Sequence, residues 1–336
     1  MRKKSKNIII LIFFGIILAL STISNFNLSS NQENDKETLE ILEKTNLRNA
    51  GPDAINITTP EDKMYFESMI GYYPATWSFD DQEAGTNGTD IYFVDDDHDN
   101  MASIVSEIDN HKGVLKFENS PSWFIMHNFN NSGDTDGTIE FYMRLQQTDV
   151  NCEFSIDNGT IAKGGIRFIF QANGKLYYKN STNDDVYLQN YSANEWYHLK
   201  IEFNTSDDWH LWINNVSVDN GAGYEYYNNP THIKRIAIKI GYGVSYFDAF
   251  GYSWDNNYEI GDNMNEGLLL SFENSTNLDW IGYSLDGQSN RTILGNTTIK
   301  MPDFGKHTIQ VCGKDSLGNV YKSNIRNFYI TPIIAN

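Results

Sequence analysis

Acidic side chains are the first residues of this sequence that could do chemistry. Two carboxyl groups held about 5 Å apart can hydrolyse a glycosidic bond, one as nucleophile and the other as acid and base. Glu140 stands alone in its segment, and Glu153 and Asp157 do not have the spacing of such a pair. We expect Glu140 to face solvent from a strand. The acidic residues therefore indicate a protein that is not an enzyme.

Motifs for metal binding and nucleophilic catalysis are missing from the sequence. It has no H-E-x-x-H and no G-x-S-x-G segment. His198 and His210 fall on neighbouring predicted strands, where a cross-strand contact can form, and we expect a surface pair. Residues 95–100 hold four aspartates without the D-x-D-x-D-G spacing that wraps calcium, which favours a solvated acidic loop. Cys152 and Cys312 are too far apart for a CxxC zinc site.

Aromatic residues offer a second kind of chemistry, the stacking of flat rings on sugars. Trp196 and Trp212 fall opposite the apolar faces of their predicted strands, and Tyr224, Tyr226 and Tyr227 crowd one loop. Aromatic faces with amide and carboxylate groups nearby are suited to binding carbohydrate. We therefore predict these five residues as a ligand-binding surface. The alternative is that a second sheet covers the rings.

Alternating apolar and polar residues predict the strands that would position these side chains. In residues 138–145, Ile139, Phe141 and Met143 fall on one face and Glu140 on the other. The same period recurs between clusters of Gly, Asn and Asp at 114–117, 166–170, 176–178, 197–203, 209–213 and 236–240. No stretch after residue 72 has a convincing helical period. The pattern predicts an all-β, two-sheet antiparallel sandwich and excludes an α/β core.

Changes of pattern divide the chain into four parts. We assign residues 1–30 to a signal peptide or N-terminal anchor, 31–70 to a polar spacer, 71–258 to the large sandwich and 262–332 to a smaller β-sandwich. The size of the last part suits an Ig-like domain. Its strands are predicted at 268–272, 280–285, 307–312 and 327–330.

The N-terminus and the net charge indicate where the protein acts. Basic residues precede the apolar run 8–20, which is short for a membrane span of about 20 residues. A cleaved signal peptide is favoured, with an uncleaved N-terminal membrane anchor as the alternative. Both place the chain outside the cell, as a secreted or cell-surface protein. The 25 basic and 44 acidic residues give a net charge of −19, which argues against a nucleic-acid partner.

Twelve N-x-[ST] sequons support this location, about double the number expected by chance. Two lie near the N-terminus, at Asn27 and Asn56. The ten that we predict as glycosylation sites are Asn87, Asn130, Asn158, Asn180, Asn190, Asn204, Asn215, Asn274, Asn290 and Asn296. Surface glycosylation is the expected modification.

Three segments carry a resemblance to a known family. The segment 194–203 followed by 209–214 resembles the W-Y-H hairpin of laminin-G-like, concanavalin A-type sandwiches, although Asn215 stands where those families have Gly. Residues 137–144 resemble their G-T-hydrophobic-E strand, and 246–252 their closing strand. The resemblance implies a jelly-roll sandwich over about residues 72–257. Retaining hydrolases of that fold carry an E-x-D-x-x-E strand, which is absent here.

The resemblance also implies a metal site and a second domain. Laminin-G-like sandwiches often hold a structural calcium between the two ends of the domain, which would involve Asp80 or Asp81 with Asp248. The sequences of residues 71–76 and 251–263 are similar to segments of predicted cell-surface proteins of archaea, Asgard lineages among them. In those proteins such a sandwich precedes an Ig-like module, which residues 283–287 and 307–319 resemble.

These observations lead to one main hypothesis and two alternatives. We expect an exported, glycosylated, non-enzymatic surface protein whose sandwich recognises a glycan or a surface protein, with calcium as its one expected cofactor. The first alternative is a purely structural component of the cell envelope. The second is a carbohydrate-active enzyme with an unfamiliar site.

Overall fold

The computed structural model describes residues 54–66, 69–87, 94–95, 102–118, 125–129, 133–159 and 164–332. The predicted signal segment and most of the acidic loop 95–100 lie outside these residues. Within the described residues, no helix is long and apolar enough to cross a membrane.

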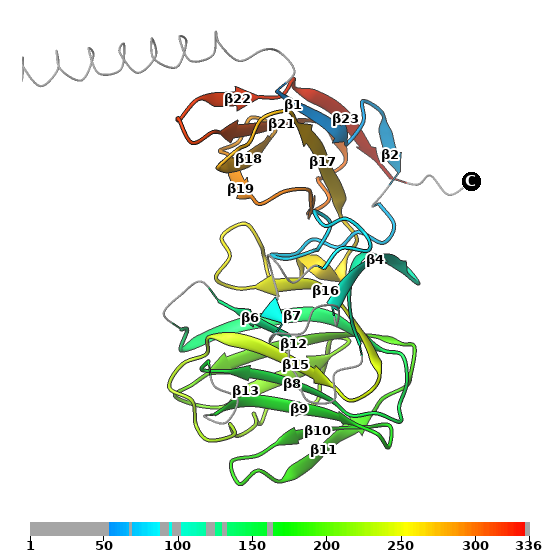
Figure 1. Ribbon diagram of the computed structural model, residues 1–336, viewed down its shortest axis with the longest axis vertical. Coiled ribbons are helices and arrows are strands. Elements are labelled where there is room, and N and C mark those ends of the chain that lie inside the picture. The colour runs from blue at the N-terminus through cyan, green and yellow to red at the C-terminus, as the bar shows by residue number, and fades with distance from the viewer. Residues whose placement is uncertain are drawn as a thin grey trace, which may run out of the picture.

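The larger module is an antiparallel jelly-roll sandwich of two seven-stranded sheets (Figure 1). Sheet I has the order β11-β10-β9-β8-β15-β6-β3, and sheet II has the order β14-β13-β12-β7-β16-β5-β4. The strands are β3 (Val94–Asp95), β4 (Ala102–Ile108), β5 (His111–Glu118), β6 (Ile125–Asn128), β7 (Asp136–Leu145), β8 (Cys152–Asp157), β9 (Gly165–Gln171), β10 (Lys175–Lys179), β11 (Asp185–Asn190), β12 (Trp196–Asn204), β13 (Trp209–Ile213), β14 (Val216–Ser217), β15 (Arg235–Ile240) and β16 (Val244–Tyr252).

The inward faces of the two sheets form the core, as the period of two predicts. Ile139, Phe141 and Met143 of β7 are fully buried, and Phe141 stacks on Phe154 of sheet I with ring centroids 4.7 Å apart. Alternation therefore decides which side chains of each strand face the opposite sheet. The prediction of an all-β sandwich is confirmed, and the described part of the chain has only a 3₁₀ turn, η2 (Asp262–Met264), as helical structure near the junction.

The smaller module is a β-sandwich built from both ends of the described chain. A three-stranded sheet has the order β1-β17-β20, and a six-stranded sheet has the order β19-β18-β21-β23-β2 with β22 paired to β21. Its strands are β1 (Ile55–Thr59), β2 (Met64–Phe66), β17 (Leu268–Asn274), β18 (Trp280–Leu285), β19 (Arg291–Ile293), β20 (Thr297–Ile299), β21 (Gly305–Lys314), β22 (Val320–Lys322) and β23 (Arg326–Thr331).

This arrangement corrects the predicted spacer over 31–70 at residues 54–66. β1 pairs with β17, and β2 pairs in parallel with β23, so the blue strands of Figure 1 lie beside brown and red ones. Ile55, Ile57 and Tyr65 belong to the core of the smaller module. Residues 54–66 are therefore part of that module, and the jelly-roll sandwich is inserted between β2 and β17.

The chain passes from one module to the other twice, and hydrogen bonds also join the modules. Gly267 N donates to Tyr72 O at 2.7 Å, and Met69 N donates to Gly267 O at 2.9 Å. Thr298 of β20 donates its hydroxyl to Asp80 Oδ2 at 2.6 Å. The modules thus meet along a hydrogen-bonded junction in addition to the covalent connections.

Candidate ligand-binding site

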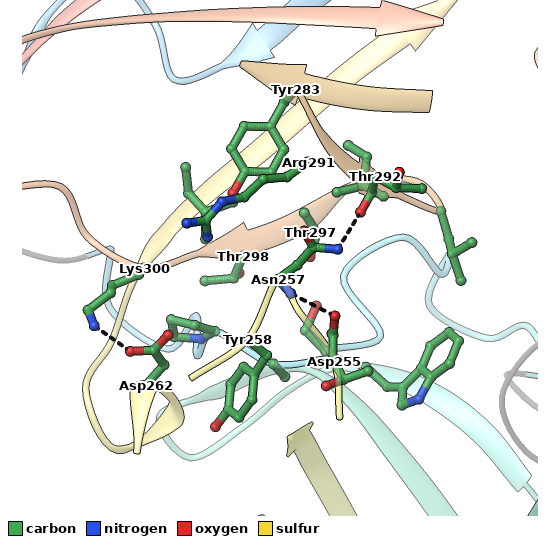
Figure 2. Close-up of a pocket in the computed structure, with 18 of the residues that line it drawn as sticks. Asp255, Asn257, Tyr258, Asp262, Tyr283, Arg291, Thr292, Thr297, Thr298 and Lys300 are labelled. Atoms are coloured by element: carbon green, nitrogen blue, oxygen red, sulfur yellow. Dashed lines mark hydrogen bonds and ion pairs between the residues drawn. The ribbon is translucent and has the colours of Figure 1, made fainter. Parts of the chain in front are cut away.

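A cleft of about 260 Å³ lies at the junction between the two modules (Figure 2). Trp77, Tyr258 and Tyr283 contribute aromatic rings, and Asn257 and Thr297 contribute polar groups. The cleft also holds four charged residues, Asp255, Asp262, Arg291 and Lys300. Ligand sites in proteins are commonly concave, partly apolar, supplied with a few polar groups and located at domain interfaces.

Elements from both modules hold these residues in place. Trp77 forms a bridge with Phe250 of β16, through two backbone hydrogen bonds of 2.9 and 3.0 Å. Tyr283 and Arg291 are directly opposite each other on β18 and β19. Asn257 follows β16 and donates its side-chain amide to Thr292 O of the other module at 3.3 Å. The cleft therefore exists only while the two modules are joined.

The charges of the cleft differ in how they are paired. Lys300 Nζ lies 2.7 Å from Asp262 Oδ1 and 3.0 Å from Glu259 Oε2. Asp255 Oδ1 accepts the backbone N–H of Asn257 at 2.9 Å. Burial raises the pKa of Tyr283, and the guanidinium of Arg291 beside it lowers this pKa. Lys300 is thus neutralised by the protein itself.

A buried polar clamp fixes the floor of the junction. Glu140 is fully buried, and its Oε1 accepts hydrogen bonds from the Tyr258 hydroxyl and from Gly261 N. Its Oε2 lies 3.5 Å from His198 Nε2, which also contacts Asn263 Oδ1 at 3.0 Å. The expectation that Glu140 faces solvent is therefore wrong, because the segment that follows β16 covers this face of sheet II.

Gly251 permits this clamp. A Cβ at this position would lie 2.2 Å from the Tyr258 ring, so only a glycine lets the ring reach Glu140. Burial raises the pKa of Tyr258 far above its ordinary value, and the charge of Glu140 acts in the same direction. The tyrosine is accordingly a donor that remains protonated.

Asp80, Asp81 and Asp248, predicted to bind calcium, do not form a metal site. Asp248 is 2% exposed and contacts His111 Nδ1 at 2.8 Å and Ala249 N at 2.7 Å. Burial raises the pKa of Asp248 and lowers that of His111 to about 3, so burial disfavours the charged form of each group. Burial also raises the pKa of Asp80 to about 8.

Calcium requires six to eight oxygen ligands, with ionised carboxylates among them. Among the described residues, no group of three or more His, Cys, Asp or Glu is placed to hold a metal ion. The oxygens of Asp80 and Asp248 instead bind neighbouring protein groups. The residues present therefore do not fit the calcium site that the resemblance implies.

None of the five aromatic residues predicted from the sequence lines the cleft. Trp196 stacks on His111 with ring centroids 4.0 Å apart, and Lys200 Nζ lies 4.0 Å from the Trp212 ring centre. Tyr224 and Tyr226 pack in the sandwich, and Tyr226 is only 3% exposed, which leaves no free ring face. Tyr227 is half-buried beside Arg167 on sheet I. Neighbouring side chains therefore cover Tyr226 and part of each of the other four rings.

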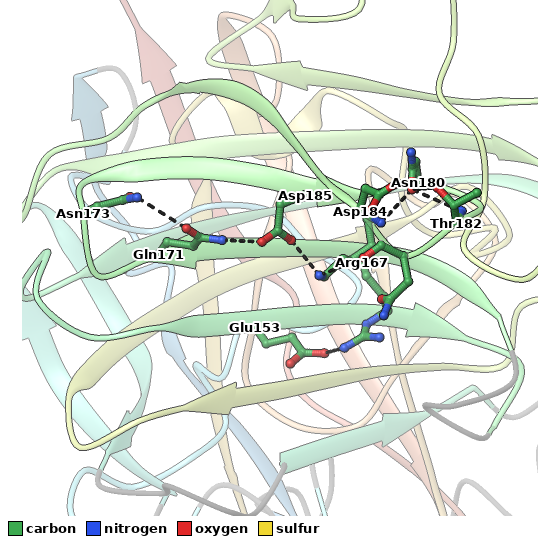
Figure 3. Close-up of polar contacts among 10 residues, drawn as sticks. Glu153, Arg167, Gln171, Asn173, Asn180, Thr182, Asp184 and Asp185 are labelled. Carbon is green, nitrogen blue, oxygen red and sulfur yellow. Dashed lines mark hydrogen bonds and ion pairs between the residues drawn. The ribbon is translucent and has the colours of Figure 1, made fainter.

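The outer face of sheet I carries a polar network (Figure 3). Arg167 pairs with Glu153, while Gln171 Nε2 and Lys179 Nζ contact Asp185 at 2.7 Å each. In the adjoining loop, Asn180 Oδ1 accepts the backbone N–H groups of Thr182 and Asp184. These charges satisfy one another, so the network stabilises the sheet edge and presents fewer free groups to a ligand than the cleft does.

The predicted pair of His198 and His210 does not form. His210 is opposite Glu202 in the register of β12 and β13, and its Nδ1 contacts Asp219 Oδ2 at 2.5 Å. His198 belongs instead to the clamp around Glu140.

The predicted glycosylation sites differ in accessibility. Asn190, Asn204, Asn215, Asn274 and Asn290 are exposed. Asn87, Asn158, Asn180 and Asn296 are half-buried, and Asn130 lies outside the described residues. Asn296 Oδ1 accepts the N–H of Phe272 at 3.0 Å, which fixes its side chain. The exposed group offers the most accessible acceptors.

The residues of the cleft could not be found by sequence patterns. Trp77, Asn257, Tyr283, Arg291 and Thr297 come from separate parts of the chain, and no spacing rule links them. Only the pairing of the modules brings them together.

Comparison with known proteins gives a likeness of fold. No protein-family model and no curated protein matches this chain. A solved sialidase is similar at 14% identity, with a TM-score of 0.37, over 49% of this chain and 19% of its own. A laminarinase catalytic domain from Thermotoga maritima has 13% identity, a TM-score of 0.36 and coverages of 54% and 98%. The carbohydrate binding module CBM66 from Bacillus subtilis has 12% identity, a TM-score of 0.31 and coverages of 41% and 85%.

Proposed function

We propose that this protein is an exported, glycosylated surface protein that recognises carbohydrate without cleaving it. The observation that carries this proposal is the cleft between the modules. Half-buried Trp77 supplies ring surface, the small exposed parts of the buried Tyr258 and Tyr283 rings line it, and Asn257 and Thr297 supply polar groups beside them. Sugars present both an apolar ring face and a set of hydroxyl groups, so this combination suits them.

Binding without hydrolysis fits the carboxylates of the cleft. A glycosidase needs two carboxyl groups on either side of the scissile bond, one of them able to donate a proton. Asp262 is ion-paired with Lys300, and Asp255 binds the backbone of its own turn. Asp262 thus joins the two modules and Asp255 fixes a turn, which favours a structural role for both carboxylates over an acid and base role.

Export accounts for the N-terminal segment and the sequons. The apolar run 8–20 suits a signal peptide or an N-terminal anchor. The exposed sequon residues Asn190, Asn204 and Asn215 belong to the jelly-roll sandwich, and Asn274 and Asn290 belong to the smaller module. Glycans on both modules would be expected of a chain displayed outside the cell.

A glycan array with the full chain tests this function. Thr297 lies within the cleft (Figure 2), and a T297W variant would fill it. The matched control is L317W, because Leu317 is 85% exposed and does not line the cleft. We expect the wild type and L317W to bind the same glycans and T297W to lose at least about tenfold in affinity. A blank array would favour a structural envelope protein, and release of shortened sugars would favour an enzyme.

A further inference from the structure

We propose that the cleft selects glycans that end in one acidic sugar, whose carboxylate pairs with Arg291. This inference rests on the proposed function and deepens it by naming the class of ligand. It follows from the charges of the cleft, from the position of Arg291 and from the net charge of the protein.

Arg291 is the cation of the cleft that remains for a ligand. Lys300 already contacts the carboxylates of Asp262 and Glu259. Arg291 is exposed, and within the described part of the chain no ion pair joins it to a carboxylate. A guanidinium presents parallel N–H groups that match the two oxygens of a carboxylate. An acidic sugar would supply the counter-charge that the protein does not.

Arg291 lines the cleft and also a neighbouring pocket of the smaller module. β19 is an edge strand, and Tyr283 lies directly across from Arg291 on β18. Figure 2 shows the guanidinium beside the Tyr283 ring, above Thr298 and between Tyr283 and Lys300. Asn257 donates its side-chain amide to Thr292 O, which holds the cleft-lining side chain in place, and its Oδ1 can accept from a sugar hydroxyl. A carboxylate on Arg291 therefore places the rest of the sugar near Asn257 and Thr297.

The charge of the whole protein limits the ligand to few carboxylates. A net charge of −19 repels a polyanionic chain, while one carboxylate at a chain end still gains the local contact with Arg291. The inference thus specifies a terminal uronic-type sugar and excludes an acidic polymer such as polygalacturonate.

Calorimetric titration of the full chain with two matched disaccharides tests the inference. Cellobiouronic acid and cellobiose differ only by a carboxylate in place of a hydroxymethyl group on the terminal sugar. We expect the wild type to bind the acid at least about tenfold more tightly than cellobiose. R291A should bind both equally weakly, and R291K should retain part of the preference. K322A is the control, because Lys322 is an exposed lysine that does not line the cleft, and it should behave as the wild type.

Several outcomes would overturn the inference. Equal affinities in the wild type, no binding of either disaccharide, a preference that survives in R291A, or tighter binding of polygalacturonate than of cellobiouronic acid would each do so. R291A keeps the sequon at Asn290, so a change in glycosylation cannot produce its effect. If the array shows neutral glycans that bind wild type and not T297W, the proposed function stands while the acidic specificity fails. A blank array would contradict both the proposed function and the acidic specificity.

Discussion

Asp80 is a carboxyl group of the jelly-roll sandwich that contacts the smaller module directly. It accepts the Thr298 hydroxyl at 2.6 Å, and a Cβ on the neighbouring Gly113 would lie 2.9 Å from its Oδ1. Burial raises its pKa to about 8, although the hydrogen bond from Thr298 acts in the opposite direction. The folded protein therefore binds a proton here that the unfolded chain, with an ordinary carboxyl pKa, releases.

The raised pKa of Asp80 predicts a pH-dependent stability that Asp80→Asn removes. The stabilising proton is present at pH 4 and is lost as the pH rises towards 8, so the wild type loses free energy of unfolding over this window. An asparagine can still accept the hydrogen bond from the Thr298 hydroxyl, and it carries no charge at any pH in this range. Since Asp80 is half-buried, we expect Asp80→Asn to be about 2 kcal/mol more stable than the wild type at pH 8 and equally stable at pH 4.

Urea denaturation of both proteins between pH 4 and pH 8 measures this difference. The control is Asp279→Asn, at an exposed position of the smaller module. Its stability should follow the wild type at every pH. A difference between Asp80→Asn and the wild type that stays constant with pH would contradict the argument.

Sequence analysis could predict which face of a strand a residue occupies and not what covers that face. It places Glu140 correctly on the outward face of β7, opposite Ile139 and Phe141. Tyr258 and Gly261, more than a hundred positions later, then bury this carboxylate. The same limit applies to Trp196 and Trp212, whose outward rings contact His111 and Lys200. Covering groups come from distant segments, and no local pattern indicates them.

At the scale of elements, long alternating strands were predictable and short ones were not. The segments 138–145, 197–203 and 209–213 all fall within observed strands, β7, β12 and β13. β1 and β2 have only five and three residues in a polar stretch, which gave too few apolar positions for a clear period. Their partners β17 and β23 lie at the other end of the chain.

The role of β1 predicts that Ile57→Ala destabilises the smaller module. Ile57 is 2% exposed in its core, and removal of such a side chain leaves a cavity. We expect a loss of about 3 kcal/mol in the free energy of unfolding, measured by chemical denaturation. Asn56→Ala, on the exposed face of the same strand, should change stability by less than about 0.5 kcal/mol. Equal effects of the two substitutions would mean that residues 54–66 are the spacer that the sequence suggested.

At the scale of the whole molecule, the insertion of the sandwich determines where the site lies. β1 opens the smaller module and β23 closes it, so both ends of the described chain belong to the module opposite the sandwich (Figure 1). The all-β architecture was predictable from local periodicity. The cleft was not, because it depends on how two modules pack together.

Hydrogen–deuterium exchange of the full chain, with and without a glycan identified on the array, tests the central claim that the cleft is the binding site. The account predicts slower exchange in residues 255–262 and 291–300, which line the cleft from both modules. Exchange should not change in β10 and β11, which contribute Lys179 and Asp185 to the polar network of sheet I. Protection of β10 and β11 without protection of the cleft would contradict the account and place carbohydrate recognition on the outer face of the sandwich.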